Sequence, residues 1–184
     1  MTVQLNSLSR RQSNPPPDAP IPYPADAMRQ DLQRVRNVWD ECQSNRDRDA
    51  IYSYLNAVYD LVSWWRVEGR ELDRARQALR LERLDAFDHE DPFAAVIRCT
   101  ADPAKADKRT RSKWSHVMRY AVEHKELPEP LGTFVKRKGG INKCAGRFSR
   151  LKRRAENGIG TPRQDDDGHR QIWPTDRMRS VRSN

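Results

Sequence analysis

The sequence has no lysine before residue 105 and none after residue 152, although the whole chain carries a net charge of +9. It also has no run of eighteen apolar residues, which argues against a membrane-spanning helix. The first 24 residues lack the continuous apolar stretch of a secretory signal, so we do not expect export. The three cysteines, Cys42, Cys99 and Cys144, are odd in number and widely spaced. We therefore expect buried free thiols in a reducing cytoplasm.

Motifs for catalysis, metal binding and cofactor binding are also missing. The four histidines are His89, His116, His124 and His169. No two of them have the spacing that places two imidazoles on one helix face, and no cysteine pair suits a zinc knuckle. The polar cluster at 88–91 suits a capped loop, and the three aspartates at 165–167 suit a solvated segment. We expect no enzyme, no metal and no cofactor; an enzyme is an alternative only through catalytic groups that are far apart in the chain.

The two ends have little apolar content. Six of the twelve prolines lie within the first 24 residues, and the segment from 157 onward is rich in glycine, aspartate and arginine. Such compositions are typical of disordered or polyproline segments. We expect a disordered arm at 1–25 and a flexible tail at 157–184, which leaves about 130 residues for a core.

Patterns of β-strands are scarce, and the first half of the core segment shows repeated helical spacing. Apolar residues recur at intervals of three and four over 28–42 and again over 51–65. Asp26 and Asp49 are the expected starts of these two helices, and Gly69 is the expected end of the second. The pair predicts an antiparallel hairpin, and a third helix around 72–84 can lie across it.

The second half predicts four further helices. Asp91 before Pro92 opens a short helix, and Asp102 before Pro103 begins the basic segment. Thr110 is the expected cap of a longer helix, which ends before the break at 127–130. A short helix then runs to the diglycine, and a last one covers 141–154. We predict an all-α fold, with a helical scaffold at 26–100, a candidate dimerisation part, and a basic helix-turn-helix-like module at 101–156.

The positive charge is confined to this module. Residues 101–160 contain 16 basic and 6 acidic residues, a surplus of +10, and the rest of the chain sums to −1. Charge on one segment of a folded chain creates a one-sided field that attracts polyanions. The predicted nucleic-acid-binding residues are Lys105, Lys108, Arg109, Arg111, Lys113, Lys136, Arg137, Lys138, Asn142, Lys143, Arg147, Arg150, Arg153 and Arg154.

The residues around the diglycine agree in part with a helix-turn-helix, whose second helix enters the major groove of DNA. With Gly139 as the turn glycine, Phe134 and Phe148 take core positions. The fit is weaker at three positions, because Val135 is large, Lys138 is charged and Ala145 is small. In the last helix Asn142 suits adenine and Arg147 and Arg150 suit guanine, whereas lysine serves mainly as a phosphate contact.

The best hypothesis is a cytoplasmic, non-catalytic protein that binds double-stranded DNA, of prokaryotic type, acting as a transcriptional regulator or an accessory factor. Two alternatives stay open: an adaptor that docks an acidic protein surface through the same basic face, and an RNA-binding protein. The adjacent residues Trp64 and Trp65 point 100° apart on a helix, so both are covered only if the helix is enclosed on two sides. A homodimer contact would supply such a second cover, which makes this pair the predicted partner interface.

Overall fold

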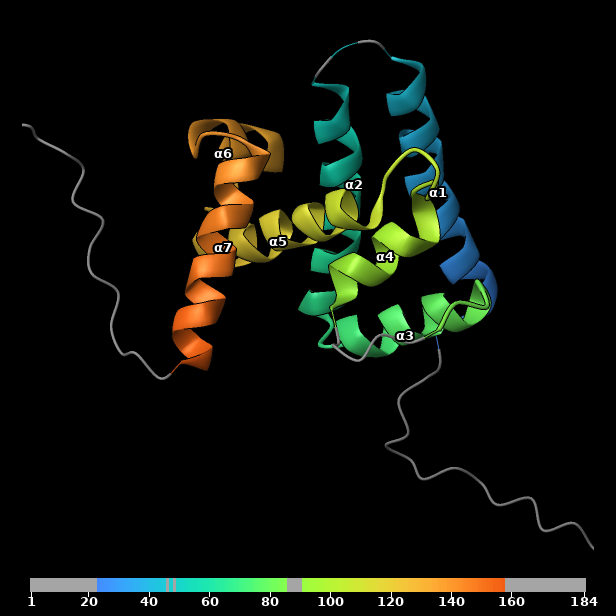
Figure 1. Cartoon of the computed structure of the whole chain (residues 1–184). Coiled ribbons are helices and arrows are strands. Elements are labelled where there is room, and N and C mark those ends of the chain that lie inside the picture. The colour runs from blue at the N-terminus through green and yellow to red at the C-terminus, as the bar shows by residue number, and fades with distance from the viewer. Residues whose placement is uncertain (1–22, 46, 48, 86–90, 158–184) are drawn as a thin grey trace, which may run out of the picture.

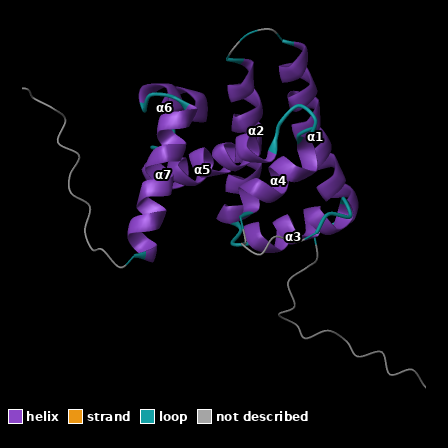
Figure 2. Cartoon of the chain, viewed as in Figure 1, coloured by secondary structure: helices purple, strands orange, loops and turns teal. Residues whose placement is uncertain are grey.

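The computed structural model describes residues 23–45, 47, 49–85 and 91–157, and within these ranges every regular element is an α-helix (Figures 1 and 2). The helices are α1 (Ala25–Ser44), α2 (Ala50–Val67), α3 (Glu71–Leu81), α4 (Pro92–Thr100), α5 (Lys108–His124), α6 (Leu131–Arg137) and α7 (Ile141–Glu156). The predicted all-α fold is confirmed. The predicted proline-rich arm, except its last residues, the tail from residue 158, the cluster at 88–90 and the aspartates at 165–167 lie outside the described residues.

The helix starts show which capping predictions hold. Asp91 caps α4 as expected, because its Oδ1 accepts a hydrogen bond of 3.1 Å from the backbone N–H of Ala94. For α5 the expectation was wrong: Asp107, not Thr110, is the cap, and its Oδ1 accepts from the N–H of Thr110 over 2.7 Å. Asp26 is likewise inside the first turn of α1, which begins one residue earlier.

The first four helices form the larger part of the molecule. α1 and α2 make the expected hairpin, and α3 and α4 pack across it (Figure 1). Gly69 follows α2 with a positive φ of 65°, so glycine meets little strain at the turn into α3. These contacts bury the predicted apolar faces of α1 and α2, including Met28, Leu32, Leu55 and Val58.

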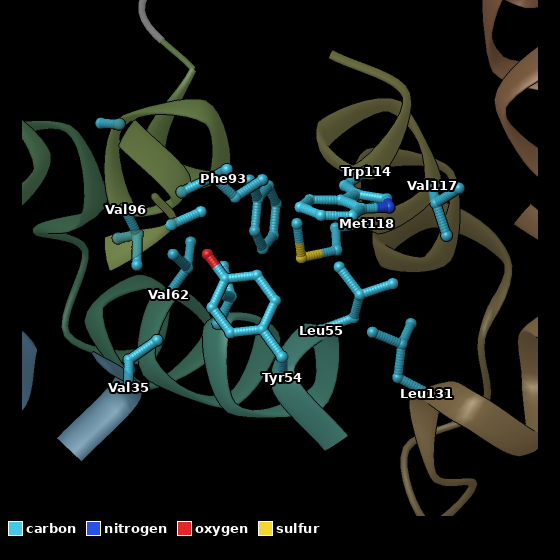
Figure 3. Close-up of a cluster of buried hydrophobic side chains, with 14 of the residues drawn as sticks. Val35, Tyr54, Leu55, Val62, Phe93, Val96, Trp114, Val117, Met118 and Leu131 are labelled. Carbon is cyan, nitrogen blue, oxygen red and sulfur yellow. The ribbon is translucent and has the colours of Figure 1, made fainter. Parts of the chain in front are cut away.

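The core continues from this scaffold into the basic segment. Trp39 of α1, Tyr54 of α2 and Trp114 of α5 meet edge to face, with ring centroids 4.9 to 6.0 Å apart. Figure 3 shows Trp114 and Met118 facing Tyr54, with Leu131 of α6 on the same side as Met118. One cluster of buried apolar side chains contains residues from all the described helices, so residue 100 does not separate two cores.

α5 connects the two parts of the molecule. It packs on α4 and α2 and also contacts α6 and α7, which lie on the side away from α1 (Figure 1). α6 is fastened to α2, where the backbone N–H of Leu131 donates to Oδ1 of Asn56 over 3.3 Å. α7 packs mainly on α5 and therefore has a long face with no neighbour among the described elements.

Candidate nucleic-acid interface

The face of α7 that is turned away from α5 is basic. Cys144, Ala145 and Phe148 are buried toward α5, and Ile141 and Leu151 are half-buried beside them. The helical period places the polar residues on the opposite side. The exposed residues there are Lys143, Arg150, Arg153 and Arg154, and the exposed Asn142 lies at the edge of this face that is in reach of α5. The apolar face predicted for this helix is therefore the buried one, whereas Arg147, one of the predicted binding residues, is half-buried.

Most of the charge on this face is uncompensated. Within the described ranges, no carboxylate forms an ion pair with Lys143, Arg150, Arg153 or Arg154. The one acidic residue of α7 is Glu156, and its Oε1 lies 3.6 Å from Nζ of Lys152. The outer face of α7 thus presents four unpaired cations, the kind of surface that attracts a polyanion.

The turn before α7 depends on its two glycines. Gly139 and Gly140 both have φ of 92°, in the region that residues with a side chain rarely adopt. A Cβ atom on Gly139 would also lie 2.6 Å from Cδ of Lys143. Arg147 stabilises the same turn, because its Nη1 donates to the carbonyl oxygen of Lys138 over 2.9 Å. Arg147 is consequently engaged in holding the turn, and Lys138 is half-buried.

A second basic group lies at the start of α5. Lys105, Lys108 and Arg109 are exposed, whereas Arg111 and Lys113 are half-buried. Hydrogen bonds from Thr110 hold the pKa of Asp107 below its usual range, so this cap carries a full negative charge at neutral pH. The group still has a positive surplus.

A direct contact joins the two basic groups. Nζ of Lys113 donates to Oδ1 of Asn142 over 3.1 Å. This contact places the second turn of α5 beside the first turn of α7. The candidate interface, defined as the outer face of α7 together with the first turns of α5, is therefore one connected surface.

Lys136 and Arg137, which were predicted to contact phosphates, are paired with carboxylates instead of free. Nζ of Lys136 lies 2.6 Å from Oδ2 of Asp49, a residue that is far from α7 in the sequence. Arg137 makes a bidentate pair with Glu129, with hydrogen bonds of 2.9 and 2.6 Å. Both ion pairs attach α6 to neighbouring segments. The charges of Lys136 and Arg137 are therefore compensated within the protein.

Two residues of α5 with no predicted role, His116 and Arg119, contact α7. The ring of His116 lies 5.1 Å from that of Phe148, and its Nδ1 is 3.4 Å from Oγ of Ser149. Burial and the nearby charge of Arg119 lower the pKa of His116, so this imidazole is neutral at physiological pH. The guanidinium of Arg119 covers the Phe148 ring at 4.6 Å. The one signal for these contacts in the sequence is the apolar residue Phe148, on the face of α7 that packs against α5.

The two tryptophans of the predicted partner interface have different environments. Trp65 is fully buried within the chain, so no partner can reach it. Trp64 is 42% exposed and lies edge-on to Tyr23, with the guanidinium of Arg74 4.8 Å from its ring centre. Only Trp64 can contribute directly to an interface with another molecule.

The three cysteines are free thiols that lie in or beside the core. Cys99 and Cys144 are buried and Cys42 is half-buried, and none of the three forms a disulfide. Burial raises the pKa of Cys99 to about 12. In the part of the chain that the structure describes, no group of histidines, cysteines and carboxylates is arranged to hold a metal ion. No described helix is long and apolar enough to cross a membrane.

Comparison with known proteins leaves the interface to be interpreted from its own geometry: no protein-family model matches the sequence, and no curated protein and no solved structure is significantly similar to it.

Proposed function

We propose that this protein is a non-catalytic binder of double-stranded DNA, acting as a transcriptional regulator or an accessory DNA-binding factor. The observation that carries the proposal is the row of four unpaired cations on the outer face of α7, Lys143, Arg150, Arg153 and Arg154. The exposed cations at the start of α5 extend this surface through the contact between Lys113 and Asn142. Phosphate contacts from such a surface would provide most of the affinity.

The shape of α6 and α7 supports a helix-turn-helix mode of binding. Three residues, Lys138 to Gly140, separate the short α6 from α7, which matches the length of such a turn. The core positions of this motif are all buried, namely Phe134, Val135, Ala145 and Phe148. The core therefore accommodates both the large Val135 and the small Ala145. In this mode α7 enters the major groove with its exposed face toward the bases.

Asn142, Arg147 and Arg150 were predicted to contact bases. Their environments show how available each side chain is for such a contact. Arg150 is exposed and has no ion-pair partner among the described residues, so it is the best candidate to contact guanine. Asn142 needs both its oxygen and its amide nitrogen to pair with adenine, and Lys113 occupies the oxygen. Arg147 would have to leave the carbonyl of Lys138.

The test compares duplex DNA, single-stranded DNA and structured RNA by mobility shift across a salt series. For roughly six neutralised phosphates, the logarithm of the duplex affinity should fall with the logarithm of salt at a slope of about −5. Reversing Arg150 and Arg153 to Glu should weaken duplex binding about tenfold or more and flatten the slope by about 2.

A matched control separates the surface from the net charge. Arg66→Glu with Arg80→Glu changes the charge by the same amount at two exposed positions of α2 and α3. This pair should bind duplex DNA with almost the affinity of the wild type. Equal losses in both pairs, or an affinity that does not depend on salt, would contradict the proposal. Tighter binding to RNA, or binding only to an acidic protein, would favour the alternatives.

A further inference from the structure

A pocket of about 650 Å³ lies between α4 and α5, next to the candidate interface. Its α5 wall consists of Lys108, Arg111, Ser112, Ser115 and His116. These positions follow one another at intervals of three, one, three and one, so they occupy one side of the first turns of the helix. This side of α5 is rich in hydrogen-bond donors.

The carboxylate that faces this wall is already engaged. Oδ1 of Asp91 accepts from the N–H of Ala94, and Oδ2 accepts from the hydroxyl of Ser115. Oδ2 also lies 3.6 Å from Nη1 of Arg119. Asp91 and Ser115 thus satisfy each other, and the charge of Asp91 is balanced by Arg119. A second carboxylate, Asp85, is on the rim and is exposed to solvent.

Several donors of the wall have no acceptor. Nε of Arg111 is shielded from solvent and has no hydrogen-bond partner in the described part of the protein. Ser112 and Lys108 are exposed to solvent, and among the described residues the Ser112 hydroxyl has no protein hydrogen-bond partner and Lys108 has no carboxylate partner, so both are available to a ligand. A buried donor without an acceptor is unusual in native structures, and a bound anion is one way to satisfy it.

We propose that this pocket binds a phosphate group, held by Arg111, Lys108 and Ser112. Guanidinium and ammonium groups are the usual phosphate ligands of proteins, and a serine hydroxyl adds a neutral donor. The inference goes beyond DNA binding by α7, because the pocket opens between α4 and α5; it shares Lys108 and Arg111 with the α5 part of the candidate interface. The phosphate can belong to the backbone of a nucleic acid or to a small phosphorylated molecule.

His116 connects this pocket to α7. It lines the pocket and at the same time contacts Phe148 and lies near Ser149. A ligand that shifts the His116 ring would therefore change the packing of α7, the helix that carries most of the candidate interface.

The experiment titrates pyrophosphate into the full chain by calorimetry, without nucleic acid. We expect saturable binding that is weakened about tenfold or more by Arg111→Gln and less by Ser112→Ala, because a charged hydrogen bond is stronger than a neutral one. Arg80→Gln is the control, since it removes the same charge from an exposed position of α3 outside the pocket and the candidate interface, and should bind pyrophosphate as the wild type does. Circular dichroism confirms folding, and Lys108→Ala replaces Arg111→Gln if that variant unfolds.

Two further measurements complete the test. Release of pyrophosphate by duplex DNA would identify the ligand as a backbone phosphate, and simultaneous binding would identify a small phosphorylated molecule; either supports the pocket. Absence of saturable pyrophosphate binding overturns the inference, as does equal binding by Arg111→Gln and the wild type. Because this titration contains no nucleic acid, its result is independent of whether the protein binds DNA.

Discussion

Lys113 of α5 donates a hydrogen bond to Asn142 of α7 across 3.1 Å, and this contact links the two basic groups of the chain. It makes one surface of two segments that are 29 positions apart. It also occupies the oxygen that Asn142 would use to recognise adenine. Lys113 therefore competes with a base for the same side chain.

The variant Lys113→Met removes both the link between the two basic groups and the competition for the oxygen of Asn142. The contact is exposed, so we expect the free energy of unfolding to change by no more than about 0.5 kcal/mol. If Lys113 moves from Asn142 to a phosphate on binding, the salt slope should fall by about 1 and affinity should drop equally for all duplexes. Mobility shifts with several duplex sequences measure both. An unchanged slope would mean that Lys113 does not reach a phosphate.

Gly139→Ala should destabilise the protein by about 1–3 kcal/mol, because φ is 92° and the new Cβ would meet Lys143. Gly146→Ala is the matched control inside α7. There the new methyl would come no nearer than 4.0 Å to Arg150, so the substitution should stabilise the helix by about 1 kcal/mol. Urea unfolding of both variants measures the difference, and equal effects would contradict the role assigned to the turn.

Trp114→Ala should cost about 3–5 kcal/mol, because its ring packs against Trp39 and Tyr54 in the centre of the core. The continuous core also predicts that the wild type unfolds in a single transition. Far-ultraviolet circular dichroism and tryptophan fluorescence should give the same midpoint. Two separate transitions would show that the segments before and after residue 100 fold independently.

His116 should make stability depend on pH. Burial lowers its pKa in the folded state below the ordinary value of 6.5, so the unfolded chain binds this proton first as the pH falls. Stability should therefore decrease as the pH drops through about 6.5 and should level off below the folded pKa. His116→Gln should remove part of this decrease in urea titrations at several pH values. The same dependence in both proteins would assign the effect to another group.

Trp64→Glu should abolish self-association if α2 forms the predicted dimer contact. Trp64 is 42% exposed, whereas the adjacent Trp65 is fully buried in the core. Leu127→Glu introduces the same charge at a 97% exposed position between α5 and α6, outside α2, and serves as the control. Sedimentation velocity should show a dimer for the wild type and the control and a monomer for Trp64→Glu. A wild-type monomer would exclude this contact.

Local chemistry made the helices predictable. Apolar spacing in α1, α2 and α7 depends only on the 3.6-residue period, and the burial of Met28, Leu55 and Phe148 follows it. The prediction failed at the start of α5, where Asp107 and Thr110, three positions apart, can each act as a cap. Asp107 accepts the bond from Thr110 because the turn at 102–106 ends at Asp107, and that turn is not encoded by a periodic pattern.

The sequence alone determined that the fold is helical and that the positive charge lies between residues 101 and 160, because helical periodicity and composition are local properties. Only the tertiary structure decided which cations remain free. Lys136 is neutralised by Asp49, which lies 87 positions away, and Arg147 is turned back onto Lys138, whereas Arg150 and Arg153 have no such partner among the described residues. Ion pairs and hydrogen bonds form only between groups a few ångströms apart in space, so only the folded chain shows which charges meet.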